Sequence, residues 1–109
     1  MRIKADNARE AAQICVRLES ARAEARILAA RIAAHPSVVR VLFFGSAATG
    51  RRFRLDSDLD LAVEGGDILS HLALTEASEF SVDVVDIPAL PDALRDGIES
   101  ECEVLYEKR

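Results

Sequence analysis

The sequence predicts a small mixed α/β (α+β) domain, in which helices cover one face of a short mixed sheet. Apolar residues recur at helical spacing over a long first segment, a β-branched and aromatic run follows, and a later run alternates leucine with aspartate. The chain has 109 residues, of which 50% are hydrophobic, as in one globular domain. We therefore expect a single domain over 1–109, with an N-terminal helix within 1–35 and a core at 36–109.

The first helix is predicted over residues 7–34. Asn7 and Glu10 form a capping pattern, apolar residues then recur every three or four positions as far as Ile32, and His35-Pro36 ends the pattern. Such a helix is about 40 Å long at 1.5 Å per residue, which is more than a domain of this size covers. Two interpretations stay open: its first half overhangs or meets a partner, or it is a core helix with a frayed start.

The remaining elements are shorter. Strands are predicted at 38–44, 58–63 and 82–87, with a weak edge strand at 103–106, because these runs are β-branched or alternate apolar with polar residues. Helices are predicted at 67–78 and at 91–98, where Pro91 suits the first turn. This order favours a small mixed sheet covered on one face.

The net charge of −5 is unevenly distributed. Residues 1–54 hold 11 of the 14 basic and 4 of the 19 acidic side chains, so an anionic ligand is expected where the two halves meet. The overall acidity argues against an extended nucleic-acid surface. No apolar run approaches the roughly 20 residues of a membrane span, and no secretory signal is visible. We therefore expect a cytoplasmic protein that contacts neither membrane nor, directly, nucleic acid.

The cysteines and histidines form no ligand pattern. Cys15 and Cys102 are far apart and are expected to be buried small hydrophobes. His71 is expected at a surface position of a helix. We assign none of them to catalysis or to a metal.

Two aspartates mark the second predicted strand. Asp58 and Asp60 are two residues apart, so they project from the same face and repel one another unless a cation lies between them. Carboxylate oxygens favour Mg²⁺ or Mn²⁺ over zinc; the alternative is a solvated acidic edge. If the valines of the third strand face the core, Asp83 lies on the same face and Asp86 on the opposite one, so we favour Asp83 as a third ligand.

A glycine-serine turn follows the first strand. Gly45 allows close approach of the backbone, and a helix beginning at Ser46 would offer N–H groups to a phosphate. Arg51, Arg52 and Arg54 follow. Within about twenty residues the chain thus combines an anion cradle, cationic side chains and paired carboxylates, which is what a nucleoside triphosphate and its metal require. The alternative interpretation of the arginines is a solvated loop.

Together these motifs resemble a known family. Phe43-Phe44-Gly45-Ser46, then eleven residues, then Asp58-Leu59-Asp60-Leu61, and later Val82-Asp83-Val84-Val85-Asp86, resemble the signature of the minimal nucleotidyltransferases (MNT) of the DNA polymerase β superfamily. The resemblance runs from about residue 30 to the C-terminus and includes the ending Glu103-Val104-Leu105-Tyr106-Glu107. It implies a polymerase β-like nucleotidyltransferase core.

The resemblance also implies a reaction, in which an acceptor hydroxyl attacks the α-phosphate of ATP and pyrophosphate leaves. Two Mg²⁺ ions are implied, together with these site residues: Asp58, Asp60 and Asp83 as catalytic and metal ligands, and Gly45, Ser46, Arg51 and Arg52 as phosphate-binding residues. The chain departs from the pattern at Thr49, where many family members carry arginine. Arg51 or Arg52 could supply the missing phosphate contact.

Stand-alone proteins of this kind resemble the antitoxins of two-gene modules, whose partner is a HEPN-type toxin. The implied activity is transfer of AMP from ATP to a tyrosine hydroxyl of that toxin. Two alternatives stay open: a binding module that neutralises a partner by contact alone, and a homodimer that modifies a small-molecule hydroxyl. The oligomeric state, homodimer or hetero-oligomer, also stays open.

Overall fold

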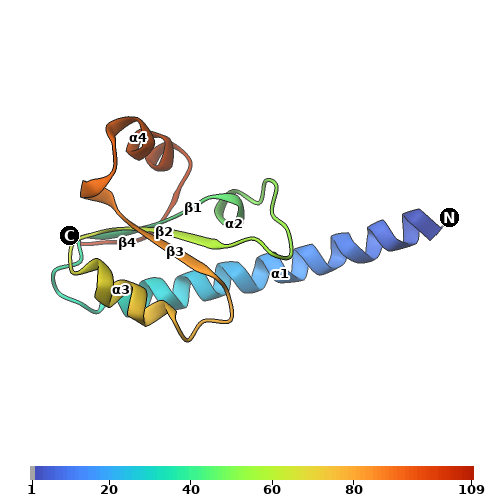
Figure 1. Cartoon of the computed structure of the whole chain (residues 1–109), viewed down its shortest axis with the longest axis horizontal. Coiled ribbons are helices and arrows are strands. Elements are labelled where there is room, and N and C mark those ends of the chain that lie inside the picture. The colour runs from blue at the N-terminus through green and yellow to red at the C-terminus, as the bar shows by residue number, and fades with distance from the viewer. Residues whose placement is uncertain (1) are drawn as a thin grey trace.

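The computed structural model describes the backbone of residues 2–109 and the side chains from Ala8 onward (Figure 1). Its elements, in chain order, are α1 (Arg2–Ala33), β1 (Arg40–Phe44), α2 (Ser46–Thr49), β2 (Leu59–Glu64), α3 (Ile68–Thr75), β3 (Val82–Asp86), the 3-10 helix η1 (Ile87–Ala89), α4 (Asp92–Ser100) and β4 (Glu103–Glu107). The strands form one sheet in the order β3-β2-β1-β4. β2 and β3 are parallel, whereas β1 pairs antiparallel with both β2 and β4, so the predicted mixed sheet is confirmed.

The larger core lies between the sheet and α1. Alternate residues of the strands, among them Phe43, Leu59 and Leu61, pack against Leu28 and Ile32 of α1, and all five side chains are fully buried. The alternation arises because successive side chains of a strand point to opposite faces. In Figure 1, α1 and α3 lie on this side of the sheet.

The opposite face carries a smaller core under α4. Leu42 and Ala62 of the sheet pack there with Ile87 and Ile98. The predicted arrangement, with helices on one face, therefore holds for α1 and α3 but is incomplete, because α4 lies across the other face (Figure 1). Ile98 is the apolar residue of α4 that enters this core, and it could not be assigned to a face from the sequence because the helix is short.

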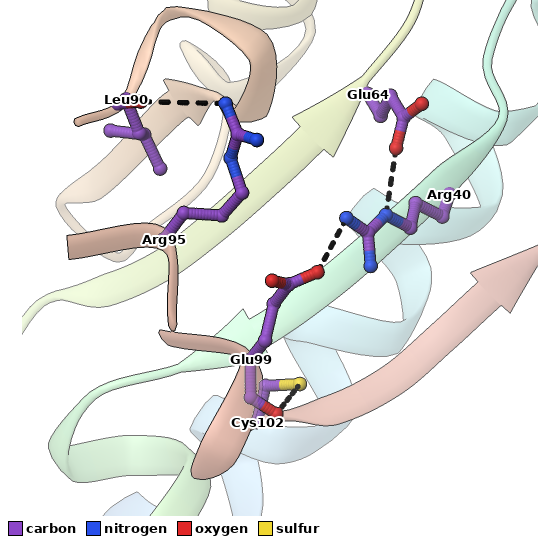
Figure 2. A network of polar contacts seen from close by, with 6 residues as sticks. All are labelled: Arg40, Glu64, Leu90, Arg95, Glu99 and Cys102. Carbon is purple, nitrogen blue, oxygen red and sulfur yellow. Dashed lines mark hydrogen bonds and ion pairs between the residues drawn. The ribbon is translucent and has the colours of Figure 1, made fainter. Parts of the chain in front are cut away.

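An ionic network fixes α4 to the sheet (Figure 2). Arg40 of β1 donates from Nε to Glu64 Oε1 at 2.8 Å and from Nη2 to Glu99 Oε2 of α4 at 2.7 Å. The hydrogen bond to Glu99 is the main cause that raises the pKa of Arg40 above its ordinary value, against the opposing effect of burial. Arg95 donates to Leu90 O at 3.4 Å and so ties α4 to the segment that follows η1.

The first half of α1 overhangs the domain. The helix is about 48 Å long at 1.5 Å per residue, and the molecule measures 54 × 31 × 23 Å. Most side chains from Ala8 to Ser20 are exposed, including Val16 at 65%, whereas Ala21 and Ala25 are fully buried. Of the two interpretations left open by the sequence, the structure supports the overhang. No helix within residues 2–109 is long and apolar enough to cross a lipid bilayer.

Three expectations need correction. The predicted start of the first helix at residue 7 is wrong, because the helix already includes Arg2 and the preceding residues contain no helix breaker. His71 is not a surface residue: it is 3% exposed, and its Nε2 lies 2.9 Å from Gly65 O. Cys15 is exposed on the overhanging part of α1 and Cys102 is half-buried, so neither is a fully buried hydrophobe.

Candidate active site

Three aspartates meet on the face of the sheet that carries the smaller core. Asp60 in β2 stands directly opposite Asp83 in β3, and Asp58 immediately precedes β2 on the same face as Asp60. Asp86 pairs with Val63 and therefore lies on the opposite face. The alternation that favoured Asp83 over Asp86 is thus observed, while the role of Asp83 stays a prediction.

The three carboxylates influence one another. The pKa of Asp60 is raised from 3.8 to about 6, first because the side chain is partly buried and then because of the negative charges of Asp83 and Asp58. Asp58 and Asp83 are exposed. A cation among these side chains would offset both the desolvation of Asp60 and the mutual repulsion.

The donor set fits magnesium. Within the described residues, no three acidic, histidine or cysteine side chains enclose a metal on their own. Mg²⁺ does not require such a cage, because it commonly binds one or two protein carboxylates and completes its shell with waters and substrate phosphates. Carboxylates on two adjacent strands, open to solvent on one side, are compatible with this mode of binding.

The Gly45–Ser46 turn places backbone directly against the acidic cluster. Gly45 has φ +81° and ψ −165°, a conformation that is essentially restricted to glycine, and an added Cβ would overlap Oδ2 of Asp60. Only glycine therefore allows β1 to turn into α2 at this distance from β2. The first N–H groups of α2 begin at Ser46, beside the carboxylates.

Arg22 anchors α2 from the side of α1. Its Nε donates to Ala47 O at 3.1 Å, and its Nη2 donates to Ala48 O at 3.4 Å. The role of Arg22 could not be predicted from the sequence, because its contacts join positions 25 and 26 residues apart and no local pattern marks them. The side chain holds the short helix in the orientation that presents the turn.

The loop arginines lie beside a cavity of about 650 Å³ between α2 and α4. Arg51 and Arg52 line it, and Arg51 pairs with Glu101 at the end of α4. Thr49 also lines the cavity, but its hydroxyl donates to Gly45 O at 3.3 Å and accepts from Arg51 N at 3.1 Å. Thr49 thus stabilises the turn, and the cationic groups here belong to Arg51 and Arg52.

By sequence, the chain matches no protein-family model and none of the curated proteins. Solved structures do match it. A chain of a toxin-antitoxin complex with AMP-PNP superposes with a TM-score of 0.57 at 24% identity, over 69% of this chain and 65% of that one. A chain from the complex of a tri-AMPylated Shewanella oneidensis HEPN toxin with an MNT antitoxin gives a TM-score of 0.55 at 20% identity, over 77% of this chain and 73% of that one.

A third neighbour is a Sulfolobus solfataricus protein provisionally called a nucleotidyltransferase, with a TM-score of 0.52 at 16% identity, over 84% of this chain and 88% of that one. The chain has the nucleotidyltransferase fold. At these identities the likeness is one of fold, and the chain spans about two thirds, 65%, of the first of these neighbours. The polymerase β-like core expected from the sequence agrees with this fold.

Proposed function

We propose that this protein is a Mg²⁺-dependent nucleotidyltransferase that transfers AMP from ATP to a tyrosine hydroxyl of a HEPN-type toxin, and so acts as its antitoxin. One observation carries the proposal: the backbone of Gly45 lies against Asp60, which in turn stands opposite Asp83. A phosphate-binding turn and a carboxylate cluster are thereby within reach of one triphosphate. We place this chemistry in residues 36–109 and in the cytoplasm, where ATP is available.

Asp58, Asp60 and Asp83 are the residues that would hold Mg²⁺. When bound, the ions supply positive charge that polarises the α-phosphate and neutralises the leaving pyrophosphate. The raised pKa of Asp60 supports this assignment, because it reflects first the partial burial of Asp60 and then the nearby negative charges of Asp83 and Asp58. Within this scheme Asp60 has to be ionised to act as a ligand.

The turn and the loop bind the triphosphate. The N–H groups at Gly45 and Ser46 donate to the β- and γ-phosphate oxygens, and Arg51 and Arg52 add positive charge. Arg51 has to exchange its partner Glu101 for a phosphate oxygen. Both side chains of this ion pair are exposed, so the exchange costs little.

Asp83 accepts the proton of the acceptor hydroxyl as its oxygen attacks the α-phosphorus. The new bond joins the acceptor oxygen to the α-phosphorus, and the bond that breaks joins this phosphorus to the oxygen bridging to the β-phosphate. Pyrophosphate leaves with that electron pair, and the proton passes from Asp83 to solvent.

The choice of acceptor rests on the structural neighbours. One is a complex whose HEPN toxin is tri-AMPylated, and another toxin-antitoxin complex contains AMP-PNP. These neighbours support a HEPN-type toxin as the partner and ATP as the donor, and the tyrosine hydroxyl as acceptor follows from the family resemblance of the sequence motifs.

Intact-mass spectrometry of the partner tests the proposal. A candidate HEPN-type partner is co-expressed and co-purified with this protein and incubated with ATP and Mg²⁺, and we expect its mass to rise by one AMP or a multiple. Asp58→Asn should abolish the increase, whereas Asp56→Asn, in the exposed loop just before it, should not. A stable complex without any increase in mass would contradict the transfer and favour a binding module.

A further inference from the structure

The overhanging half of α1 projects from the end of the sheet that carries the candidate site. β1 ends at Phe44, and the short helix that follows is held against α1 by Arg22. The residues of α1 that precede Arg22 therefore extend beyond α2, past the end of the sheet at which Asp58 leads into β2 (Figure 1). The proposed function gives no role to this part of the chain, although it lies beside the site.

A groove lies between the overhang and the loop that follows α2. It has a volume of about 470 Å³ and is lined by residues of α1 from Arg9 to Ser20 and by Leu55 of the loop. Val16 is 65% exposed and Leu55 is 43% exposed, although both line the same concavity. Large apolar side chains that face solvent together, rather than singly, are typical of an interaction surface. We call this surface the α1 groove.

The spacing of the residues in the α1 groove suits a second helix. On α1 they form two rows with a period of four residues, Ala12-Val16-Ser20 and Arg9-Gln13-Arg17. Rows of this period are the ridges between which the side chains of a packed helix insert. Ala12 and Ser20 are small, so another helix can approach α1 closely on either side of Val16.

The charged side chains of the α1 groove are cationic. Arg9 and Arg17 line it, and no carboxylate does so among the side chains described from Ala8 onward. The guanidinium of Arg17 lies 3.8 Å from the centroid of the Phe80 ring, and its Nη1 is 3.9 Å from Oε1 of Glu79, too far for a hydrogen bond. The groove therefore presents positive charge that carboxylates of another molecule complement.

A second copy of this chain does not complement the α1 groove. Two-fold pairing of the groove about Gln13 would place Arg9 of one helix beside Arg17 of the other, because both lie four residues from the centre. Like charges placed opposite one another disfavour such a dimer. The charge pattern favours a different protein, with acidic side chains beside its apolar contact.

The loop connects the α1 groove to the acidic cluster over a short distance. Leu55 precedes Asp58 by three residues, which span at most about 10 Å. This stretch is a closed turn, since Ser57 N donates to Arg54 O at 3.1 Å and Arg54 N donates to Ser57 Oγ at 2.8 Å. A protein seated in the groove is thereby held beside Asp58.

We propose that the α1 groove docks an amphipathic helix of the protein that accepts AMP. The helix places an apolar residue against Val16 and Leu55, and carboxylates against Arg9 and Arg17. Docking raises the effective concentration of the acceptor hydroxyl at the acidic cluster, because the second contact is then made within one complex. The inference rests on the proposed function for the role of the partner as acceptor.

Binding of the partner to the full chain tests the α1 groove. The HEPN-type partner that co-purifies with the wild type is separated and titrated by calorimetry into the wild type, Val16→Glu and Arg9→Glu. We expect each substitution to weaken partner binding by about tenfold or more, because one places a charge in the apolar contact and the other opposes the carboxylates of the helix. Both variants should bind ATP with Mg²⁺ within about twofold of the wild type, since neither residue contacts the nucleotide.

Ile27→Glu is the matched control for Val16→Glu. Ile27 is also a β-branched residue of α1, is 47% exposed and lies outside the groove. Its substitution should leave the binding of both partner and ATP unchanged, and melting curves by circular dichroism establish that all the variants are folded. If Val16→Glu and Arg9→Glu weaken partner binding no more than Ile27→Glu does, the groove is not the docking site, and the proposed function stands without it.

Two further outcomes would overturn the docking of an acidic helix. A wild type that sediments as a dimer, and that Val16→Glu converts to a monomer, would assign the groove to a second copy of this chain. If no HEPN-type protein co-purifies with the wild type, the partner of the proposed function is wrong, and the docked helix with it.

Discussion

Single residues determine whether the turn and the carboxylates can lie together. Gly45 is the clearest case, because its backbone conformation and its contact with Asp60 both exclude a side chain. Gly97 is the opposite case, since neither restriction applies there. Substitution by alanine is therefore expected to have opposite effects on the free energy of unfolding at the two positions.

We expect Gly45→Ala to lower the free energy of unfolding by about 1–3 kcal/mol, the cost of holding alanine in a region of backbone conformation that suits only glycine. Urea denaturation measures the change. Gly97→Ala should instead raise the free energy of unfolding by about 0.5–1 kcal/mol, because it replaces a glycine inside a helix. A Gly45→Ala protein as stable as the wild type would show that the turn does not have the described conformation.

The ionisation of Asp60 makes the stability of the metal-free protein depend on pH. Its pKa is about 6 in the folded chain against an ordinary 3.8, so the folded state binds the proton more tightly than the unfolded state. This contribution to stability is complete below about pH 4 and is lost as the pH rises through about 6. The whole change in the pKa of Asp60 corresponds to about 3 kcal/mol in the free energy of unfolding. Because Asp60 is partly exposed to solvent, we expect a contribution of about 1 kcal/mol.

Asp60→Asn should accordingly remove this pH dependence. We expect the wild type, kept in a chelator, to lose stability between pH 4 and pH 7 by about 1 kcal/mol more than the variant. Chemical denaturation at a series of pH values measures the difference. Parallel curves for the two proteins would mean that Asp60 is solvated and isolated from its acidic neighbours.

At the scale of elements, the hydrophobic pattern predicted the sheet well. Alternation in β2 and β3 placed Leu59 and Leu61 in the core, and hence Asp58, Asp60 and Asp83 on the other face. At α2 the sequence left a helix or a turn open after Gly45, and η1 was not predicted, because four and three residues are too few to show a helical period. The start of α1 was misplaced because Asn7, a good cap by type, lies inside a longer helix.

The parts of the site that were missed depend on contacts between distant segments. Arg22 reaches α2 across 25 residues, and Arg40 reaches Glu99 across 59. Arginines and glutamates are frequent in this chain, so no local pattern distinguishes these from solvated ones.

The anchor that joins α1 to α2 gives a prediction for Arg22. Arg22→Met keeps most of the apolar stem but removes both hydrogen bonds to α2, each worth about 1.5–3 kcal/mol when the donor is charged. We expect faster amide hydrogen exchange at Ala48 and Thr49, whose N–H groups close the first turn of α2, and weaker binding of Mg²⁺ and ATP.

The matched control for this prediction is Arg26→Met, one turn further along α1. Among the residues whose side chains the structure describes, Arg26 forms only an exposed ion pair, with Glu103 at 3.7 Å. The Arg26→Met substitution should leave both the amide hydrogen exchange of α2 and the binding of ATP unchanged. Unaltered exchange in the Arg22→Met protein would contradict the role of Arg22 as a positioning residue.

At the scale of the whole molecule, the site lies where the two oppositely charged parts of the chain meet. The basic first half contributes the turn and the arginine loop, and the acidic second half contributes the three aspartates. Neither part has the charge pattern to bind a triphosphate together with its metal. Folding brings them together by pairing β1 with β2 and β2 with β3.

The measurement that tests this account most directly is calorimetric titration of ATP into the metal-free protein, with and without Mg²⁺, for three proteins. The wild type should bind ATP only with Mg²⁺, and Asp60→Asn should lose that binding. Asp86→Asn is the matched control: it alters an aspartate on the same sheet but on the opposite face, and it should bind as the wild type does. If Asp60→Asn binds Mg²⁺ and ATP as tightly as Asp86→Asn, the acidic face of β2 and β3 is not the nucleotide site.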